Sequence, residues 1–104
     1  MSETKTAGTT RGAILDEAKY LTEGDRNDAY GDPVENQQQI ADIFNAVTGH
    51  NISARDVAIM HQATKMARRY KNPLHRDSYV DGPAYTGIEY ECALAEQRDE
   101  RQTS

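Results

Sequence analysis

Two carboxylates near the middle of the chain, Asp77 and Asp81 in the stretch DSYVD, have a spacing that could support metal chemistry. If this stretch is helical, the two side chains lie one turn apart and point the same way. Paired carboxylate oxygens can share a divalent cation such as Mg²⁺, which also binds substrate phosphates. A metal held in this way can activate an attacking water. The pair therefore predicts a catalytic Mg²⁺ site formed by Asp77 and Asp81.

Two structural alternatives remain open for this stretch. Asp77 or Ser78 can serve as a helix cap, and an Asp pair at this spacing is common on a solvated surface. Gly82-Pro83 follows at once, and Pro83 inside a helix would lose its bond to the Tyr79 carbonyl. If the helix instead starts near Pro83, the two carboxylates need not share a face.

The segment before these carboxylates concentrates positive charge in an acidic chain. On a helix, the residues His61, Lys65, Arg68 and Asn72 share one face, and His75 follows in the next loop. Arg and Lys side chains on one line can hold the oxygens of a polyphosphate. The alternative is a solvated basic face that complements the negative end of the helix dipole.

The polar stretch GDRNDAYGDPVEN at residues 24–36 is the third candidate region. Arg26 and Tyr30 can stack on or hydrogen-bond to a nucleobase, and Asn36 can read a base edge or a ribose. Alternatively, Tyr30 packs over a helix end and Arg26 pairs with an acid. With Lys65, Arg68 and His75, these three residues form the predicted substrate-binding set.

Four helices are needed to position these residues, and no segment shows the alternation of a strand. The first carries an apolar stripe and stops near Gly24, and the second begins at Pro33 and ends at Gly49. The third opens with a capping-box-like pair, Ser53 and Asp56, and closes before Pro73. The stripes predicted to face the core are Ile14, Leu15, Ala18 and Leu21; Ile40, Ile43, Phe44 and Val47; Val57, Met60, Ala63, Ala67 and Tyr70; and Tyr85, Ile88, Cys92 and Ala95.

The apolar content is low for a domain of 104 residues. Leu, Ile, Val and Phe together number 15, and the net charge is −5. This fraction is below the roughly 20% that marks disorder at high net charge. We expect a disordered arm over residues 1–12, one all-helical domain over 13–97, a polar tail over 98–104, and completion of the core by homo-oligomerisation into a dimer or tetramer.

Several functional classes are excluded by composition. The single cysteine rules out a disulfide framework or a thiolate zinc cluster within one chain. No apolar run reaches the length of a membrane span, and the N-terminus lacks the apolar region of a secretory signal. Nucleic-acid binding is not expected, because the basic cluster is local and the pI is about 5.1. We expect a cytoplasmic protein.

Three stretches together resemble a family of small phage and prophage proteins. They are GDRNDAYGDPVEN, then DVAIMHQATKMARRYKNPLHRDSYVD, then the tyrosine of GPAY, within residues 14–95. That family in turn resembles the all-α nucleotide pyrophosphohydrolases of the MazG and dimeric dUTPase type. The resemblance implies a four-helix MazG-like bundle that binds Mg²⁺ and splits nucleoside triphosphates in an infected bacterial host. Asp77 and Asp81 match the second acidic motif, and Lys65 and Arg68 match K-x-x-R; the other matching positions are Asp25, Arg26, Tyr30, Gly31, Asn36, Asn72 and His75.

The chain departs from that pattern at the first acidic motif. No E-x-x-E occurs, and Gln62 and Lys65 stand at the expected positions. Glu35 is the residue that could supply a third metal oxygen. The loss of carboxylates weakens a site for a hard cation. Two hypotheses therefore stand: a Mg²⁺-dependent nucleotide pyrophosphohydrolase, and a catalytically inactive protein on the same scaffold that sequesters a nucleotide or binds a host protein.

Overall fold

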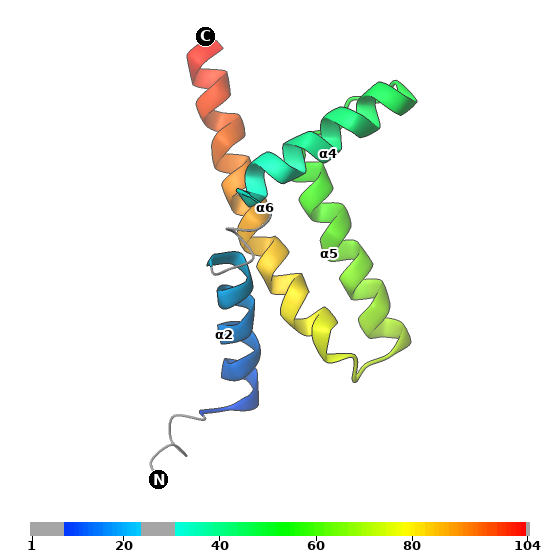
Figure 1. Cartoon of the computed structure of the whole chain (residues 1–104), viewed down its shortest axis with the longest axis vertical. Coiled ribbons are helices and arrows are strands. Elements are labelled where there is room, and N and C mark those ends of the chain that lie inside the picture. Colours follow the sequence, from blue (N-terminus) through cyan, green and yellow to red (C-terminus); the bar gives the residue numbers. More distant parts are fainter. Residues whose placement is uncertain (1–7, 24–30, 104) are drawn as a thin grey trace.

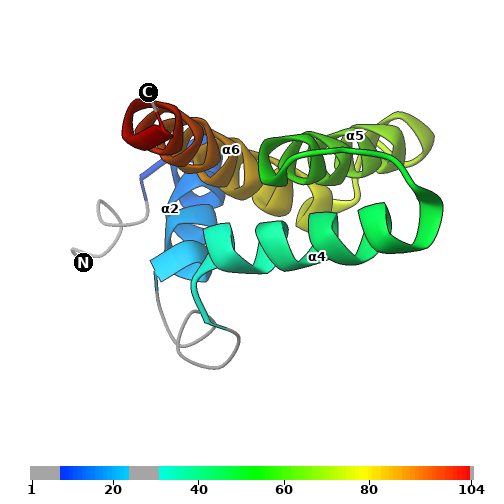
Figure 2. The same ribbon diagram turned by 90° about the horizontal axis from the view of Figure 1, so that it is seen from above.

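The computed structural model describes residues 8–23 and 31–103, which form four α-helices without any strand. These are α2 (Thr10–Glu23), α4 (Pro33–Thr48), α5 (Ala54–Lys71) and α6 (Arg76–Thr103). The helices α5 and α6 form an antiparallel pair joined by a short turn, α2 packs along the first half of α6, and α4 crosses the other end of the pair (Figures 1 and 2). The predicted all-α, four-helix class is confirmed.

Local capping explains the bounds of α4. The carboxylate of Asp32 accepts a hydrogen bond from the Glu35 N–H at 3.1 Å, and Pro33 occupies the first turn, where its missing N–H costs nothing. At the other end, Gly49 adopts a φ of 81°, a left-handed conformation, and its N–H bonds to the Asn45 carbonyl. The helix bounds predicted from Pro33 and Gly49 are confirmed.

The capping box predicted for α5 is also confirmed. The Ser53 hydroxyl accepts from the Asp56 N–H at 3.1 Å, and the Asp56 carboxylate accepts from the Ser53 N–H at 2.9 Å. Just before it, the Asn45 amide bonds to both the N–H and the C=O of Ile52. The connection between α4 and α5 is therefore fixed at both of its ends.

The helix α6 resolves the question raised by Pro83. It runs without interruption from Arg76 to Thr103 and contains Pro83 as its eighth residue. Asp77 and Asp81 therefore lie on one helix, one turn apart. The helix also extends well beyond the predicted stripe that runs from Tyr85 to Ala95. At the two ends of the chain, helix covers residues 10–12 of the predicted arm and 98–103 of the predicted tail.

The core is small and is built from small side chains. Ala54, Ala58, Ile88 and Cys92 form a buried cluster between α5 and α6, and Val34 and Tyr85 pack against it. Alanines at the contact allow the two helices to approach closely. The predicted α6 stripe at Ile88 and Cys92 is confirmed.

The predicted core stripe of α5 is wrong beyond Val57. Met60, Ala63, Ala67 and Tyr70 are exposed, because α6 packs instead against the face of α5 that carries Ala54, Ala58, His61 and Lys65. The apolar stripe of α4 also remains exposed, while Gln37 and Ala41 are the buried residues of that helix. In both helices, small or polar residues face the core.

Among residues 8–23 and 31–103, no helix combines the length and the apolar character that crossing a bilayer requires.

Candidate functional site

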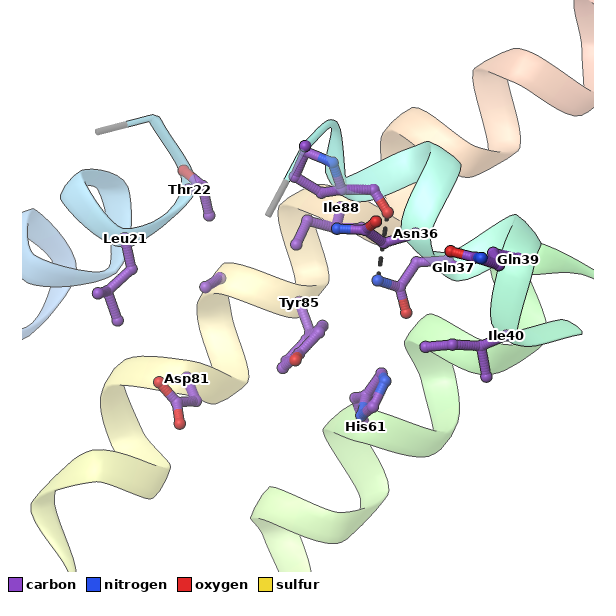
Figure 3. Close-up of a pocket in the computed structure, with 13 residues that line it drawn as sticks. Leu21, Thr22, Asn36, Gln37, Gln39, Ile40, His61, Asp81, Tyr85 and Ile88 are labelled. Carbon is purple, nitrogen blue, oxygen red and sulfur yellow. Dashed lines mark hydrogen bonds between the residues drawn. The ribbon is translucent and has the colours of Figure 1, made fainter. Parts of the chain in front are cut away.

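A cavity of about 400 Å³ lies where α2, α4, α5 and α6 meet. Figure 3 shows Leu21, Asp81, Tyr85 and His61 facing this space from three of the helices, with Gln37 reaching in from α4. Apolar atoms supply most of the wall. The residues that line the cavity include Leu21, Pro33, Asn36, Gln37, Ile40, His61, Asp81, Ala84, Tyr85 and Ile88.

Gln37 carries the one buried side-chain polar atom without a hydrogen-bond partner in the described part of the chain. Its residue is only 5% exposed, and its amide nitrogen donates to the Pro33 carbonyl at 3.2 Å. Its carbonyl oxygen, Oε1, is unpaired and points toward Tyr85 and His61 (Figure 3). A buried carbonyl without a donor costs about 1–3 kcal/mol, which a ligand N–H would recover.

An aromatic pair forms the floor of the cavity. The rings of His61 and Tyr85 stack with centroids 4.4 Å apart and an interplanar angle of 19°. Burial lowers the pKa of His61 below its ordinary value of 6.5, and the nearby charge of Lys65 lowers it further. The imidazole is therefore neutral at pH 7 and presents an uncharged, flat surface.

An ion pair joins α5 to α6 at the edge of the cavity. The ammonium of Lys65 lies 2.9 Å from Oδ2 of Asp81, and the two side chains are 15% and 24% exposed. Because Asp81 lines the cavity, this pair places one anion and one cation beside it. The structure thus brings together two residues predicted for different roles, Asp81 as a metal ligand and Lys65 as a phosphate ligand.

The other two predicted metal ligands are exposed, and one of them, Asp77, lies one turn from Asp81 on α6. Asp77 is exposed in the first turn of α6, and Glu35 is exposed on α4. Across the described residues, no group of three or more His, Cys, Asp or Glu side chains is placed to hold a metal ion. The Asp81 carboxylate is paired with the Lys65 ammonium, so a Mg²⁺ ion would have to compete with this ammonium for the carboxylate.

The remaining predicted substrate-binding residues are dispersed. Asn36 lines the cavity, Arg68 is exposed on α5, and Nδ1 of His75 lies 2.7 Å from the hydroxyl of the buried Ser78. The contact between His75 and Ser78 joins the turn to the first turn of α6. Arg26 and Tyr30 lie outside the described residues.

Gln62 holds one of the positions where the resemblance places the first acidic motif, and its contacts are structural. Its amide donates to the Glu89 carboxylate at 2.8 Å and accepts from the Thr86 hydroxyl at 2.7 Å. Glu89 also lies 3.7 Å from the Arg55 guanidinium. This position thus links α5 to α6 by hydrogen bonds.

Gln37 and Tyr85 have a role in the cavity that the motif analysis did not assign to them. The signal for Gln37 was present in the sequence, because Val34, Gln37 and Ala41 fall on one face of the second predicted helix. A glutamine in the middle of a buried helical face is unusual, since buried polar groups require partners.

Comparison with known proteins identifies the family. A model described as a domain of unknown function, DUF6378, matches residues 13–93. Similar relatives are the Gene 55 protein of Mycobacterium phage D29, 41% identical over 72% of this chain and 50% of the relative, and the Gene 55 protein of Mycobacterium phage L5, 37% identical over 86% of this chain and 56% of the relative. The chain therefore spans about half the length of these relatives.

No solved structure matches the chain. The phage relatives confirm the resemblance to phage proteins. Because the match extends over most of the four helices, the chain belongs to the DUF6378 family.

Proposed function

We propose that this protein binds a nucleotide in the cavity between α2, α4, α5 and α6, with the base inside and the phosphates at the rim. The observation that carries the proposal is the unpaired carbonyl oxygen of Gln37, which is buried and directed into the cavity. A nucleobase offers N–H donors at its edge, so it would satisfy this oxygen.

The wall of the cavity fits the flat faces of a base. Leu21, Ile40 and Ile88 provide apolar contacts, and the stacked pair of Tyr85 and His61 offers an aromatic surface. Stacking on an aromatic side chain contributes about 1–3 kcal/mol per base, largely independent of base identity. This surface favours a planar heterocycle over a flexible sugar or an aliphatic chain.

The phosphate end is assigned to Lys65 and Arg68. The ammonium of Lys65 has three N–H donors, and the ion pair with Asp81 leaves the others available for phosphate oxygens. Arg68 lies one turn further along α5 and is exposed. We place this binding in the cytoplasm of an infected bacterial host, where the phage relatives would meet free nucleotides.

A Mg²⁺-dependent nucleotide pyrophosphohydrolase is the second candidate. It is favoured by one observation, that Asp77 and Asp81 lie one turn apart on the uninterrupted helix α6. The ion pair of Asp81 with Lys65 is an argument against the hydrolase, because the Lys65 ammonium already lies beside the carboxylate that would bind the metal ion. We therefore place sequestration of the nucleotide ahead of hydrolysis.

Thermal unfolding with and without nucleotides tests the binding. Deoxynucleoside monophosphates and triphosphates at millimolar concentration should raise the Tm of the wild-type chain, because a ligand that binds only the folded state stabilises it. The variant Gln37→Met should lose this rise, while Gln38→Met should keep it, because Gln38 is exposed and bonds to Asp42 on the same helix. No rise with any nucleotide would overturn the proposal.

Pyrophosphate release decides between the two candidates. With Mg²⁺ and a panel of deoxynucleoside triphosphates, sequestration predicts the same background from wild type and Asp81→Asn. Turnover that is present in wild type and absent in Asp81→Asn would instead establish the hydrolase.

A further inference from the structure

We infer that the base held in the cavity is guanine, and that the buried carbonyl of Gln37 selects it by accepting two hydrogen bonds at once. The inference rests on the nucleotide binding proposed above and deepens it by naming the base. Selection depends on one atom, Oε1 of Gln37, which points toward Tyr85 and His61 (Figure 3).

The side-chain amide of Gln37 is held with its carbonyl toward the cavity. Its nitrogen donates to the Pro33 carbonyl one turn earlier in α4, at 3.2 Å. Turning the amide over would bring Oε1 against the Pro33 carbonyl, so that two acceptors would face each other without a hydrogen between them. The helix backbone therefore fixes Gln37 as an acceptor toward the cavity, and it cannot donate to a ligand there.

Both acceptor positions of this oxygen are available. A carbonyl oxygen has two lone pairs, and Oε1 has no hydrogen-bond partner among the residues that the structure describes. A ligand with one N–H would satisfy one of these lone pairs. A ligand with two neighbouring N–H groups would satisfy both.

Among the common nucleobases, only guanine carries N–H donors on two adjacent atoms. Its N1–H and its 2-amino group lie side by side on the Watson–Crick edge, by which proteins read an unpaired base. Adenine and cytosine place a ring nitrogen, which is an acceptor, next to the amino group. Thymine and uracil place a carbonyl on each side of the N3–H. In these four bases a ligand acceptor would lie beside Oε1 and repel it.

The cavity also has room for a base with two rings. Its volume of about 400 Å³ lies within the roughly 300–1,000 Å³ of small-molecule sites. The stacked rings of His61 and Tyr85 offer a flat surface, on which a purine covers more area than a pyrimidine does. Stacking therefore favours purines, and the hydrogen bonds to Gln37 separate guanine from adenine.

Isothermal titration calorimetry of the full-length chain with dGMP and dIMP tests the choice of base without any variant. The two nucleotides differ only in the 2-amino group, since hypoxanthine keeps the N1–H and the 6-carbonyl. We expect dGMP to bind roughly tenfold more tightly than dIMP, because dIMP leaves one lone pair of a buried carbonyl without a donor. We expect dAMP, dCMP and dTMP to bind more weakly than dIMP.

Two variants assign the preference to Gln37. Gln37→Met should bind dGMP and dIMP with equal affinity, because its side chain accepts no hydrogen bond. Gln38→Met should keep the tenfold difference, since Gln38 is exposed and bonds to Asp42. Circular dichroism of both variants without ligand checks that the helices are retained.

The outcomes separate the choice of base from nucleotide binding itself. If wild type binds dGMP and dIMP equally well, the assignment of guanine is wrong, although nucleotide binding is then established. A tenfold difference that persists in Gln37→Met would also overturn it. Absence of binding by every nucleotide tested would overturn both proposals.

Discussion

The two halves of the α5–α6 pair are held together by different chemistry. At one end, Ala54 and Ala58 pack against Ile88 and Cys92 in a buried apolar cluster, with the ion pair of Arg55 and Glu89 beside it. At the other, Lys65 pairs with Asp81, and the Arg69 guanidinium lies 5.1 Å from the centre of the Tyr79 ring. The cavity lies between the two halves, with Ile88 and Asp81 both in its wall.

The apolar half contributes mainly to stability, and the charged half carries groups that can take part in chemistry. The apolar half fixes the distance between the helices, because close packing of small residues tolerates little change. The charged half holds groups that can also contact a ligand, so its contribution to folding is conditional on pairing. Substitutions in the two halves should therefore lower the free energy of unfolding by different amounts. The change that restores the lost stability should also differ between the halves.

Truncation in the apolar half should have the largest effect. Ile88→Ala is expected to lower the free energy of unfolding by about 3 kcal/mol, because it removes buried methyl groups and leaves a cavity. Urea denaturation measures this directly. Tyr90→Ala, on the exposed side of the same helix, should cost about 0.5 kcal/mol or less. Equal costs for the two variants would show that this half is not the core.

Breaking the ion pair should have a smaller and reversible effect. Lys65→Met leaves the Asp81 carboxylate unpaired at a position only 24% exposed, and we expect a loss of about 2 kcal/mol. The double variant Lys65→Met with Asp81→Leu should recover most of this loss, because no charge is then left alone. A double-mutant cycle gives the coupling, and simple additivity would show that the pair does not couple the helices.

The sequence was sufficient to predict the elements that depend on local signals. Pro33, Gly49 and the Ser53–Asp56 box mark helix ends through features within a few residues, and each was recognisable, whereas the cap supplied by Asp32 was not predicted. The direction in which α5 faces was not predictable from its stripe, because Met60 and Tyr70 point away from α6. A single chain does not reveal which of two faces is covered by its own helices.

The site was predictable in part for a similar reason. Lys65, Asp81 and Asn36 were identified as candidates, but the pairing of Lys65 with Asp81 depends on the register between α5 and α6. The importance of Gln37 depends on a cavity built by four helices. Such contacts between distant segments leave no local pattern in the residues that make them.

The stability of the folded chain should depend on pH through His61, which lies between the two halves of the helix pair. Its pKa is lowered by burial and then by Lys65, so the folded chain resists protonation more than the unfolded chain does. This contribution to stability is therefore fully present above pH 6.5 and is lost as the pH falls toward the folded pKa. Urea denaturation at pH 5.5 and 7.5 should show a smaller loss in His61→Gln than in wild type. A slope in His61→Gln identical to that of wild type would contradict the assignment.

The smallest effect is expected for the reactivity of the Cys92 thiol, which belongs to the apolar half of the helix pair. Cys92 is 1% exposed, and burial together with the neighbouring Glu96 raises the pKa of the thiol. Its reaction with a disulfide reagent at pH 8 should be roughly tenfold or more slower in the folded chain than in urea. Equal rates would show that this half opens readily in the native state.

The side-chain amide of Gln37 gives the most direct test that the cavity takes a nucleobase. In a heteronuclear NMR titration with deoxynucleoside monophosphates, its Nε2 resonances should shift saturably as a ligand donates to the adjacent Oε1. The amide of Gln38, exposed on the same helix, should not shift. If the resonances of Gln37 stay unmoved at millimolar nucleotide while the protein remains folded, the cavity does not bind a base.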